Sequence, residues 1–228
     1  MVEIEESVGH IYDKKEFFEI YWRYYLLLEK DFLSTKRYLE IDEYNGKTYS
    51  TEYSKQYQAI GSEIDVFCKE FCKEIDSNFD GDRIQHYCKT ITDNITDFTA
   101  TKIYVKDWGK EICPWDDWIY KVQTNKKGIQ KVSSNNPKWW TLYNKVKHQR
   151  TTKLTSYNNI PFYKYANQEN IINALGALYI LEMACLELIK EKETKLCGEK
   201  CCYEYEKSAL FSTNCKEEST FYQKYTCT

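Results

Sequence analysis

Residues 139–150 read Trp139-Trp140-Thr141-Leu142-Tyr143-Asn144-Lys145-Val146-Lys147-His148-Gln149-Arg150. On a helical wheel, the apolar side chains recur at the i, i+3, i+4, i+7 spacing and share one stripe, made by Trp139, Leu142, Tyr143 and Val146. This stripe predicts a helix that packs against a core. Pro137 suits the start of the helix, because the N–H that proline lacks would have no intrahelical partner there.

The polar side chains of the same stretch lie on another face of the predicted helix. This face holds Trp140, Asn144, Lys147 and His148. Arg150 instead falls within the apolar stripe, where an unpaired charge would be costly. Three arrangements avoid that cost: the helix ends before Arg150, its side chain reaches solvent, or a carboxylate pairs with it.

Composition limits the class of protein. The chain has 228 residues, 42% of them hydrophobic, with only 8 Gly and 3 Pro, which is typical of one globular domain with or without an appendage. The net charge of −3 excludes a chain that is basic throughout. Residues 121–153 nevertheless carry eight Lys, one Arg and one His, so they form either a local patch for a polyanion or an ordinary solvated basic surface.

The rest of the chain predicts further helices. Helical periodicity covers residues 13–40, 54–75, 83–97 and 167–191. Together with the tryptophan helix they predict an all-α fold, an antiparallel bundle of about five helices. Gly61 lies in the apolar stripe of the second helix, where glycine costs about 1 kcal/mol, so we expect another helix to approach closely there.

Residues 98–136 break the helical pattern. They predict an irregular insert before the fourth helix, in which two β-like runs flank Asn125-Lys126-Lys127-Gly128 and suit a hairpin. The bundle is expected to occupy residues 1–192. Residues 193–228, rich in Cys and Tyr, are expected to form an appendage that is mobile or loosely packed.

The sequence predicts neither a cofactor nor a metal site. The chain has 10 Cys, but Cys197 and Cys201 have no histidine nearby and no second pair at zinc-site spacing. The acidic N-terminus lacks a signal-peptide pattern, and no run of 18 uncharged apolar residues suggests a membrane span. We therefore expect a cytoplasmic protein with reduced thiols and no membrane contact.

Glu182 lies near the middle of the apolar face of the last helix. Buried acids are rare unless they are paired, so Glu182 is the first expected partner of Arg150 or His148, and Glu63 is the second.

The segment from Tyr143 to Arg150 resembles the HEPN-type helical proteins. The resemblance covers roughly residues 10–190 and continues through 26–33, 60–65 and 174–182. It is closest to uncharacterised bacterial members and weaker to abortive-infection proteins. It implies an antiparallel helical bundle, commonly dimeric, in a superfamily that includes metal-independent ribonucleases.

The catalytic HEPN signature has an arginine, four to six residues and then a histidine on one helix. His148 matches the histidine, but the positions that would hold the arginine are Thr141, Leu142 and Tyr143. The resemblance therefore carries over to His148 alone.

The residues and the resemblance together suggest two alternative functions. The first is a metal-independent ribonuclease or an RNA-binding effector of a bacterial defence or stress response. In it, His148 transfers the proton, Lys147 and Arg150 hold the phosphate, and Asn144 orients the imidazole. Trp140, Lys145 and Lys153 are the expected RNA contacts, and the protein is a homodimer or has a protein partner.

The second function is a non-catalytic helical bundle that acts through protein partners. In this alternative Asn144, Lys147, His148 and Arg150 join the two glutamates named above in a buried polar network that sets the helix register.

Overall fold

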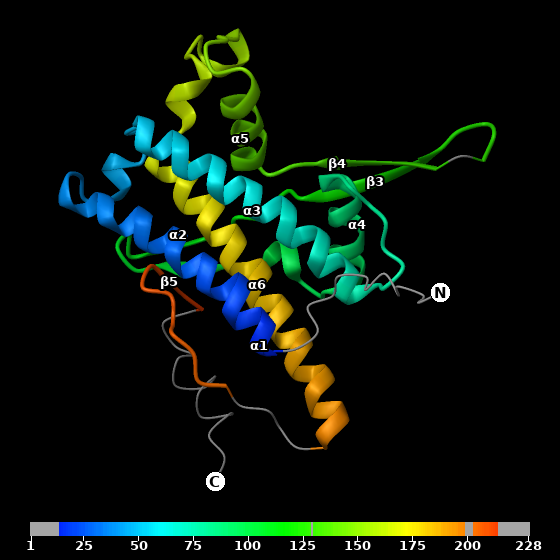
Figure 1. Ribbon diagram of the computed structural model, residues 1–228. Coiled ribbons are helices and arrows are strands. Elements are labelled where there is room, and N and C mark those ends of the chain that lie inside the picture. Colours follow the sequence, from blue (N-terminus) through cyan, green and yellow to red (C-terminus); the bar gives the residue numbers. More distant parts are fainter. Residues whose placement is uncertain (1–13, 129, 199–202, 214–228) are drawn as a thin grey trace, which may run out of the picture.

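The computed structural model describes residues 14–128, 130–198 and 203–213, and within them the fold is mixed rather than all-α (Figure 1). The helices are α1 (Lys14–Glu16), α2 (Arg23–Ser34), α3 (Thr51–Ile75), α4 (Ile84–Asn94), α5 (Lys138–His148) and α6 (Gln168–Cys197). The strands are β1 (Ile103–Val105), β2 (Lys110–Ile112), β3 (Ile119–Thr124), β4 (Gln130–Asn135) and β5 (Phe211–Ser212). A π-helix, Phe17–Trp22, connects α1 to α2.

Helix α6 lies at the centre of the fold, packed against α3 and α2 (Figure 1). The predicted apolar face of this helix is confirmed, since its five large aliphatic side chains are all buried: Ile171, Leu175, Leu178, Leu186 and Ile189. Asn167 caps the helix by accepting a 3.0 Å hydrogen bond from the Asn170 N–H. Among the described residues this is the one helix with the length and hydropathy of a membrane span, and 72% of its most apolar window is buried inside the protein.

The two sheets correct the predicted all-α fold. Strands β2, β1 and β5 form an antiparallel sheet in that order, and β3 pairs with β4 in a separate hairpin. The predicted hairpin therefore exists, but the insert that contains it is largely ordered rather than irregular. Residues 102–108 alternate like a strand and contain β1, but β2 and β5, with three and two residues, are too short to show an alternating pattern, so the sheet was not predicted.

Strand β5 returns the C-terminal segment to the core. Leu210 and Phe211 are buried, and β5 pairs with β1 in the register Val105↔Phe211. Helix α6 also runs past the expected domain boundary at residue 192. Residues 203–213 therefore belong to the folded domain, whereas residues 199–202 and 214–228 of the expected appendage lie outside the described residues.

A buried carboxylate fastens this returning segment to α2. Glu29, only 2% exposed, accepts hydrogen bonds from the Tyr25 hydroxyl at 2.8 Å, from the Ser208 hydroxyl and from the Ala209 and Leu210 N–H groups at 2.8 and 3.2 Å. Such multiple donation offsets the cost of burying the charge. Glu29 thus links elements that are about 180 residues apart in sequence.

We predict that Glu29→Ala lowers the free energy of unfolding by about 3 kcal/mol, because it removes the acceptor of the buried Leu210 N–H and of the buried Tyr25 and Ser208 hydroxyls. For a chain of this size, that loss lowers the Tm by roughly 6–12 °C in calorimetry. Glu19→Ala removes an exposed carboxylate from the adjacent π-helix and is the matched control. Equal Tm values for the two variants would contradict the role given to Glu29.

Candidate nucleic-acid interface

The N-terminal half of α5 is fixed in the core by aromatic packing. Trp139, 4% exposed, packs edge-on against Trp115 with 5.3 Å between ring centroids and donates a 2.6 Å hydrogen bond to the Pro114 carbonyl. The Tyr57 hydroxyl of α3 donates to the Trp139 carbonyl. All four side chains of the predicted apolar stripe are buried, which confirms that prediction.

The contact between α5 and α3 depends on Gly61. A Cβ at this position would overlap the ring of Tyr143, so only glycine allows α5 to lie this close. The predicted close approach of a second helix at Gly61 is therefore confirmed. As a result, the first turns of α5 are held on α3 and the polar side chains beyond them face solvent.

Helix α5 ends at His148, which decides among the three arrangements open to Arg150. Lys147, His148 and Arg150 are all exposed, and the helix stops before Arg150 would enter the core. The cluster is therefore not a buried polar network, and the predicted network is wrong. Within the described residues, neither Arg150 nor His148 pairs with a glutamate.

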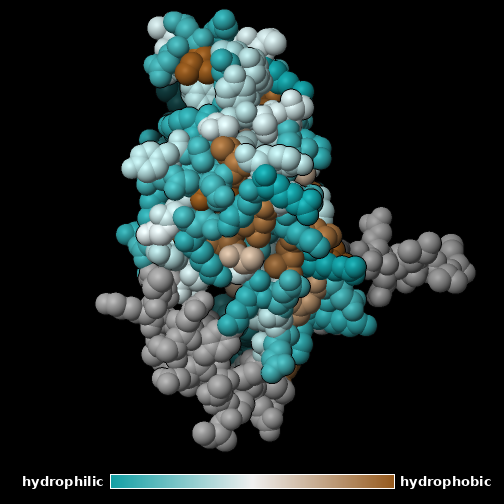
Figure 2. Space-filling view, turned by 90° about the vertical axis from the view of Figure 1, so that its left-hand side faces the viewer, coloured by the Kyte–Doolittle hydropathy of each residue, from teal (hydrophilic) through white to brown (hydrophobic). Residues whose placement is uncertain are grey.

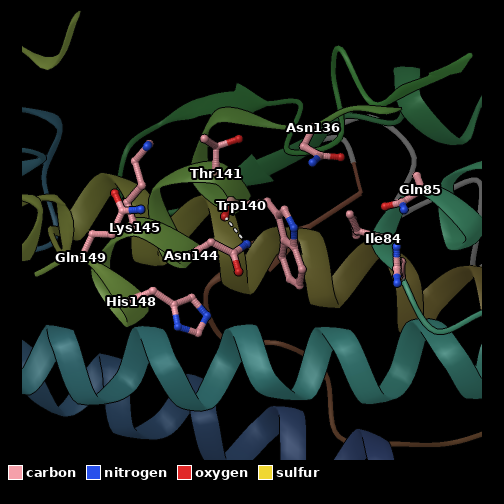
Figure 3. Close-up of a pocket in the computed structure, with 10 residues that line it drawn as sticks. Ile84, Gln85, Asn136, Trp140, Thr141, Asn144, Lys145, His148 and Gln149 are labelled. Carbon is pink, nitrogen blue, oxygen red and sulfur yellow. Dashed lines mark hydrogen bonds between the residues drawn. The ribbon is translucent and has the colours of Figure 1, made fainter. Parts of the chain in front are cut away.

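The exposed end of α5 forms one wall of an open pocket of about 540 Å³ (Figure 3). Helix α5 contributes the largest share of the lining, the start of α4 contributes a second wall, and Asn136 joins them from the β4–α5 connection. The lining residues are Arg83, Ile84, Gln85, Asn136, Trp140, Thr141, Asn144, Lys145, His148 and Gln149.

Four of the predicted site residues meet at this pocket. Trp140, Asn144, Lys145 and His148 all line it. The Asn144 amide donates a 3.0 Å hydrogen bond to the Trp140 carbonyl (Figure 3). No hydrogen bond from Asn144 to His148 appears among the described residues, so the predicted orienting contact is absent.

Trp140 is not the open stacking surface that was predicted. Only 6% of it is exposed, and its ring packs against Trp139 and Tyr143 at centroid distances of 5.8 and 5.2 Å. It forms an apolar part of the pocket floor, beneath the polar lining residues. A base could touch its edge but could not stack on its face.

Lys147, Arg150 and Lys153 are exposed but do not line the pocket. Lys147 lies over the Tyr143 ring, 5.6 Å from its centroid. Burial raises the pKa of Asp65, and the positive charge of Lys147 offsets part of that rise. Lys145 is steadied by the Tyr157 and Phe162 rings at 5.2 and 4.8 Å. Lys145 is therefore the predicted cation that the structure positions most firmly at the pocket.

Six of the ten lining residues were not predicted from the sequence, and Arg83 is the one among them that carries a charge. It precedes α4 by one residue and lies 65 positions before His148, so no spacing rule connects the two. Its guanidinium is 3.6 Å from the Asp82 carboxylate, but both side chains are mostly exposed and the attraction is weak. The N-terminus of α4 adds its partial positive charge to this side of the pocket.

Charge is segregated along the chain. Between Trp118 and Gln168 there are ten Lys and Arg residues and no Asp or Glu, whereas the remainder holds 22 cations and 35 acids. None of these ten cations makes an ion pair within the parts of the chain that the structure describes. We call residues 118–168 the acid-free segment. It includes the hairpin, α5 and the loop after it.

Glu182 does not fulfil its predicted role as a partner of Arg150 or His148. It is fully buried, and neither carboxylate oxygen has a hydrogen-bond partner among the described residues. Burial raises the pKa of Glu182 well above its ordinary value of 4.5, and the nearby Glu63 adds to the shift. Burial also raises the pKa of Glu63. The fully buried Glu182 and the half-buried Glu63 thus form an acid pair that does not line the pocket.

The raised pKa makes folding stability dependent on pH. A carboxyl whose pKa is raised on folding contributes full stability below its unfolded-state value, here near 4.5, and loses that contribution as pH rises through the folded-state pKa. We predict that the wild-type Tm falls from about pH 5 upward. In Glu182→Gln the fall is smaller, and the variant melts several degrees above wild type at alkaline pH.

The control for this prediction is Glu191→Gln, which neutralises an exposed acid on the same helix and should keep the wild-type profile. The measurement is the Tm by circular dichroism across the pH range. Parallel Tm profiles for wild type and Glu182→Gln would show that Glu182 ionises without cost in the folded state.

A scan against protein-family models finds no match, and searches of curated proteins and of solved structures also find none. The resemblance to HEPN proteins therefore stays a prediction.

Proposed function

We propose that this protein binds RNA through the acid-free segment and the pocket beside it. The observation that carries the proposal is the gathering of two cations, Lys145 and Arg83, and of the His148 imidazole around one open pocket. RNA phosphates are the anions that such a surface attracts, with counterion release as the driving force. The acid-free segment itself adds no repulsion to the approach of a polyanion, while Asp82, 3.6 Å from Arg83, is an acid close to the pocket.

A small anion would use only a fraction of this surface. Lys147, Arg150 and Lys153 are exposed beyond the pocket, and the hairpin carries further lysines. A ligand with many phosphates can contact both regions at once. The choice of RNA over DNA is supported by the HEPN resemblance, as is the proposed setting, a cytoplasmic effector of bacterial defence or stress response.

A second candidate function is metal-independent cleavage of the bound RNA. It is favoured by the position of His148 in the same pocket as Arg83 and Lys145. Neutral His148 would take the proton of a 2′-hydroxyl as that oxygen attacks phosphorus. The bond to the 5′-oxygen breaks, the 5′-oxygen takes a proton from water, and a cyclic phosphate remains.

In this reaction Arg83 would take the place of the signature arginine, which is absent upstream of His148 on α5. The arginine approaches from α4, and with Lys145 it would stabilise charge on the phosphate oxygens. His148 is the catalytic candidate, while Arg83 and Lys145 are the candidates for phosphate binding.

The proposed homodimer has a candidate surface on the π-helix and α2. The side of the molecule that includes α2 is mostly hydrophilic but shows hydrophobic areas near its centre (Figure 2). Ile20, Tyr24 and Leu27, spaced at helical intervals, are 52%, 39% and 51% exposed. A protein partner could use the same surface.

We predict that Arg83→Ala weakens binding of a single-stranded RNA of about 16 nucleotides by several-fold. It should also reduce the slope of log K against log salt by about 0.7, the contribution of one phosphate contact. His148→Ala should bind within a few-fold of wild type but form no cyclic-phosphate product. Fluorescence anisotropy measures the binding, and gel analysis with EDTA present measures the cleavage.

Lys69→Ala is the matched control, since it removes an exposed cation from α3 outside the pocket. Wild-type protein that fails to bind RNA at low salt would refute the proposed function. Equal cleavage by wild type and His148→Ala would refute the catalytic role while leaving binding intact.

A further inference from the structure

The β3–β4 hairpin has two chemically different faces. Its register pairs Lys121 with Ser133 and Gln123 with Lys131, and paired residues point to the same side of the ribbon. The opposite side holds Tyr120 and the Val122–Val132 pair, together with the polar Thr124, Gln130 and Ser134. One face therefore carries the strand lysines, with Ile119 exposed at its base, and the other carries no charged side chain.

The face that carries Tyr120 contacts α4 near the base of the hairpin, which fixes the direction of the basic face. The Tyr120 hydroxyl donates a 2.6 Å hydrogen bond to the Asp93 carboxylate on α4, and Lys89 also pairs with Asp93. An isolated two-stranded hairpin is marginally stable, so this support orders the ribbon at its base. Lys121 and Lys131 point away from α4 and its acid, towards solvent.

The hairpin projects from the body of the protein beside α4 (Figure 1). Its turn carries Lys126 and Lys127, both exposed, and the Asn125 side chain accepts a 2.9 Å hydrogen bond from the Lys127 N–H. At its base, β4 is followed directly by Asn136, which lines the pocket. A row of lysines thus runs outward from the edge of the pocket.

We propose that the basic face of the hairpin is a second phosphate-contacting surface, along which an RNA strand seated in the pocket continues. This inference rests on the proposed function and specifies its substrate as an extended strand rather than a mononucleotide. Six residues of strand span about 20 Å, so the ribbon can accompany several nucleotides. Charge complementarity identifies the occupant, because the basic face and the turn together offer four cations and no acid.

Lysines on edge strands can also have a simpler role, since they prevent edge-to-edge aggregation. The two roles predict different results when lysine is replaced by glutamine. Loss of a phosphate contact weakens RNA binding and reduces its salt dependence, whereas loss of protection against aggregation changes solubility and leaves the affinity of soluble protein unchanged.

The experiment compares Lys121→Gln/Lys131→Gln with wild type and with Lys30→Gln/Lys69→Gln, which removes two exposed lysines from α2 and α3. Binding is measured by fluorescence anisotropy, with single-stranded RNAs of about 4 and about 16 nucleotides, between about 50 and 200 mM salt. Duplex RNA and single-stranded DNA of matching length are the competitors.

We expect the hairpin variant to bind the longer RNA roughly tenfold more weakly at low salt, with a salt slope reduced by about 1.4. Its affinity for the shorter RNA should equal that of wild type, and the control should match wild type on both RNAs.

If the hairpin variant bound the longer RNA with the affinity and salt slope of wild type, the hairpin inference alone would be overturned. Absence of RNA binding by wild type would overturn the proposed function and the inference together. Stronger competition by duplex RNA than by single strands would also overturn the proposed single-stranded path.

Discussion

The aromatic anchoring of α5 is the constraint on which the site depends. Trp139 and Tyr143 hold one side of the helix against Trp115 and α3, and Gly61 permits the contact. The polar side chains are then left at the end of a helix whose direction is fixed. Because the helix stops at His148, its cations stay in solvent, where they can meet a ligand.

Much of the helical framework could be predicted from periodicity, and the reasons for the failures are physical. The stripe of α5 and the apolar face of α6 are long enough to show the 3.6-residue period, and both are buried as predicted. Strand β5 has two residues, and its pairing with β1 crosses more than a hundred positions. No local pattern encodes a contact of that kind, so the second, β-sheet layer was missed.

In the candidate site too, residues on one helix could be predicted and a residue from a distant segment could not. Asn144, Lys145 and His148 were found because they share one helix and its period, whereas Arg83 arrives from another element. Trp140 was misjudged, since a wheel shows direction but not how much of a large ring its neighbours cover. The pairing of Glu182 with Arg150 also failed. It relied on the rule that buried acids are paired, but burial here favours the protonated acid beside Glu63.

We propose that charge segregation along the chain creates one RNA-binding face. Photocrosslinking of the intact protein to a uridine-rich single-stranded RNA, followed by mass spectrometry of the peptide adducts, tests this proposal. We expect adducts on peptides from residues 118–168 and around Arg83, and we expect them to disappear as salt rises. Adducts concentrated on α2 or α6, or adducts insensitive to salt, would contradict it.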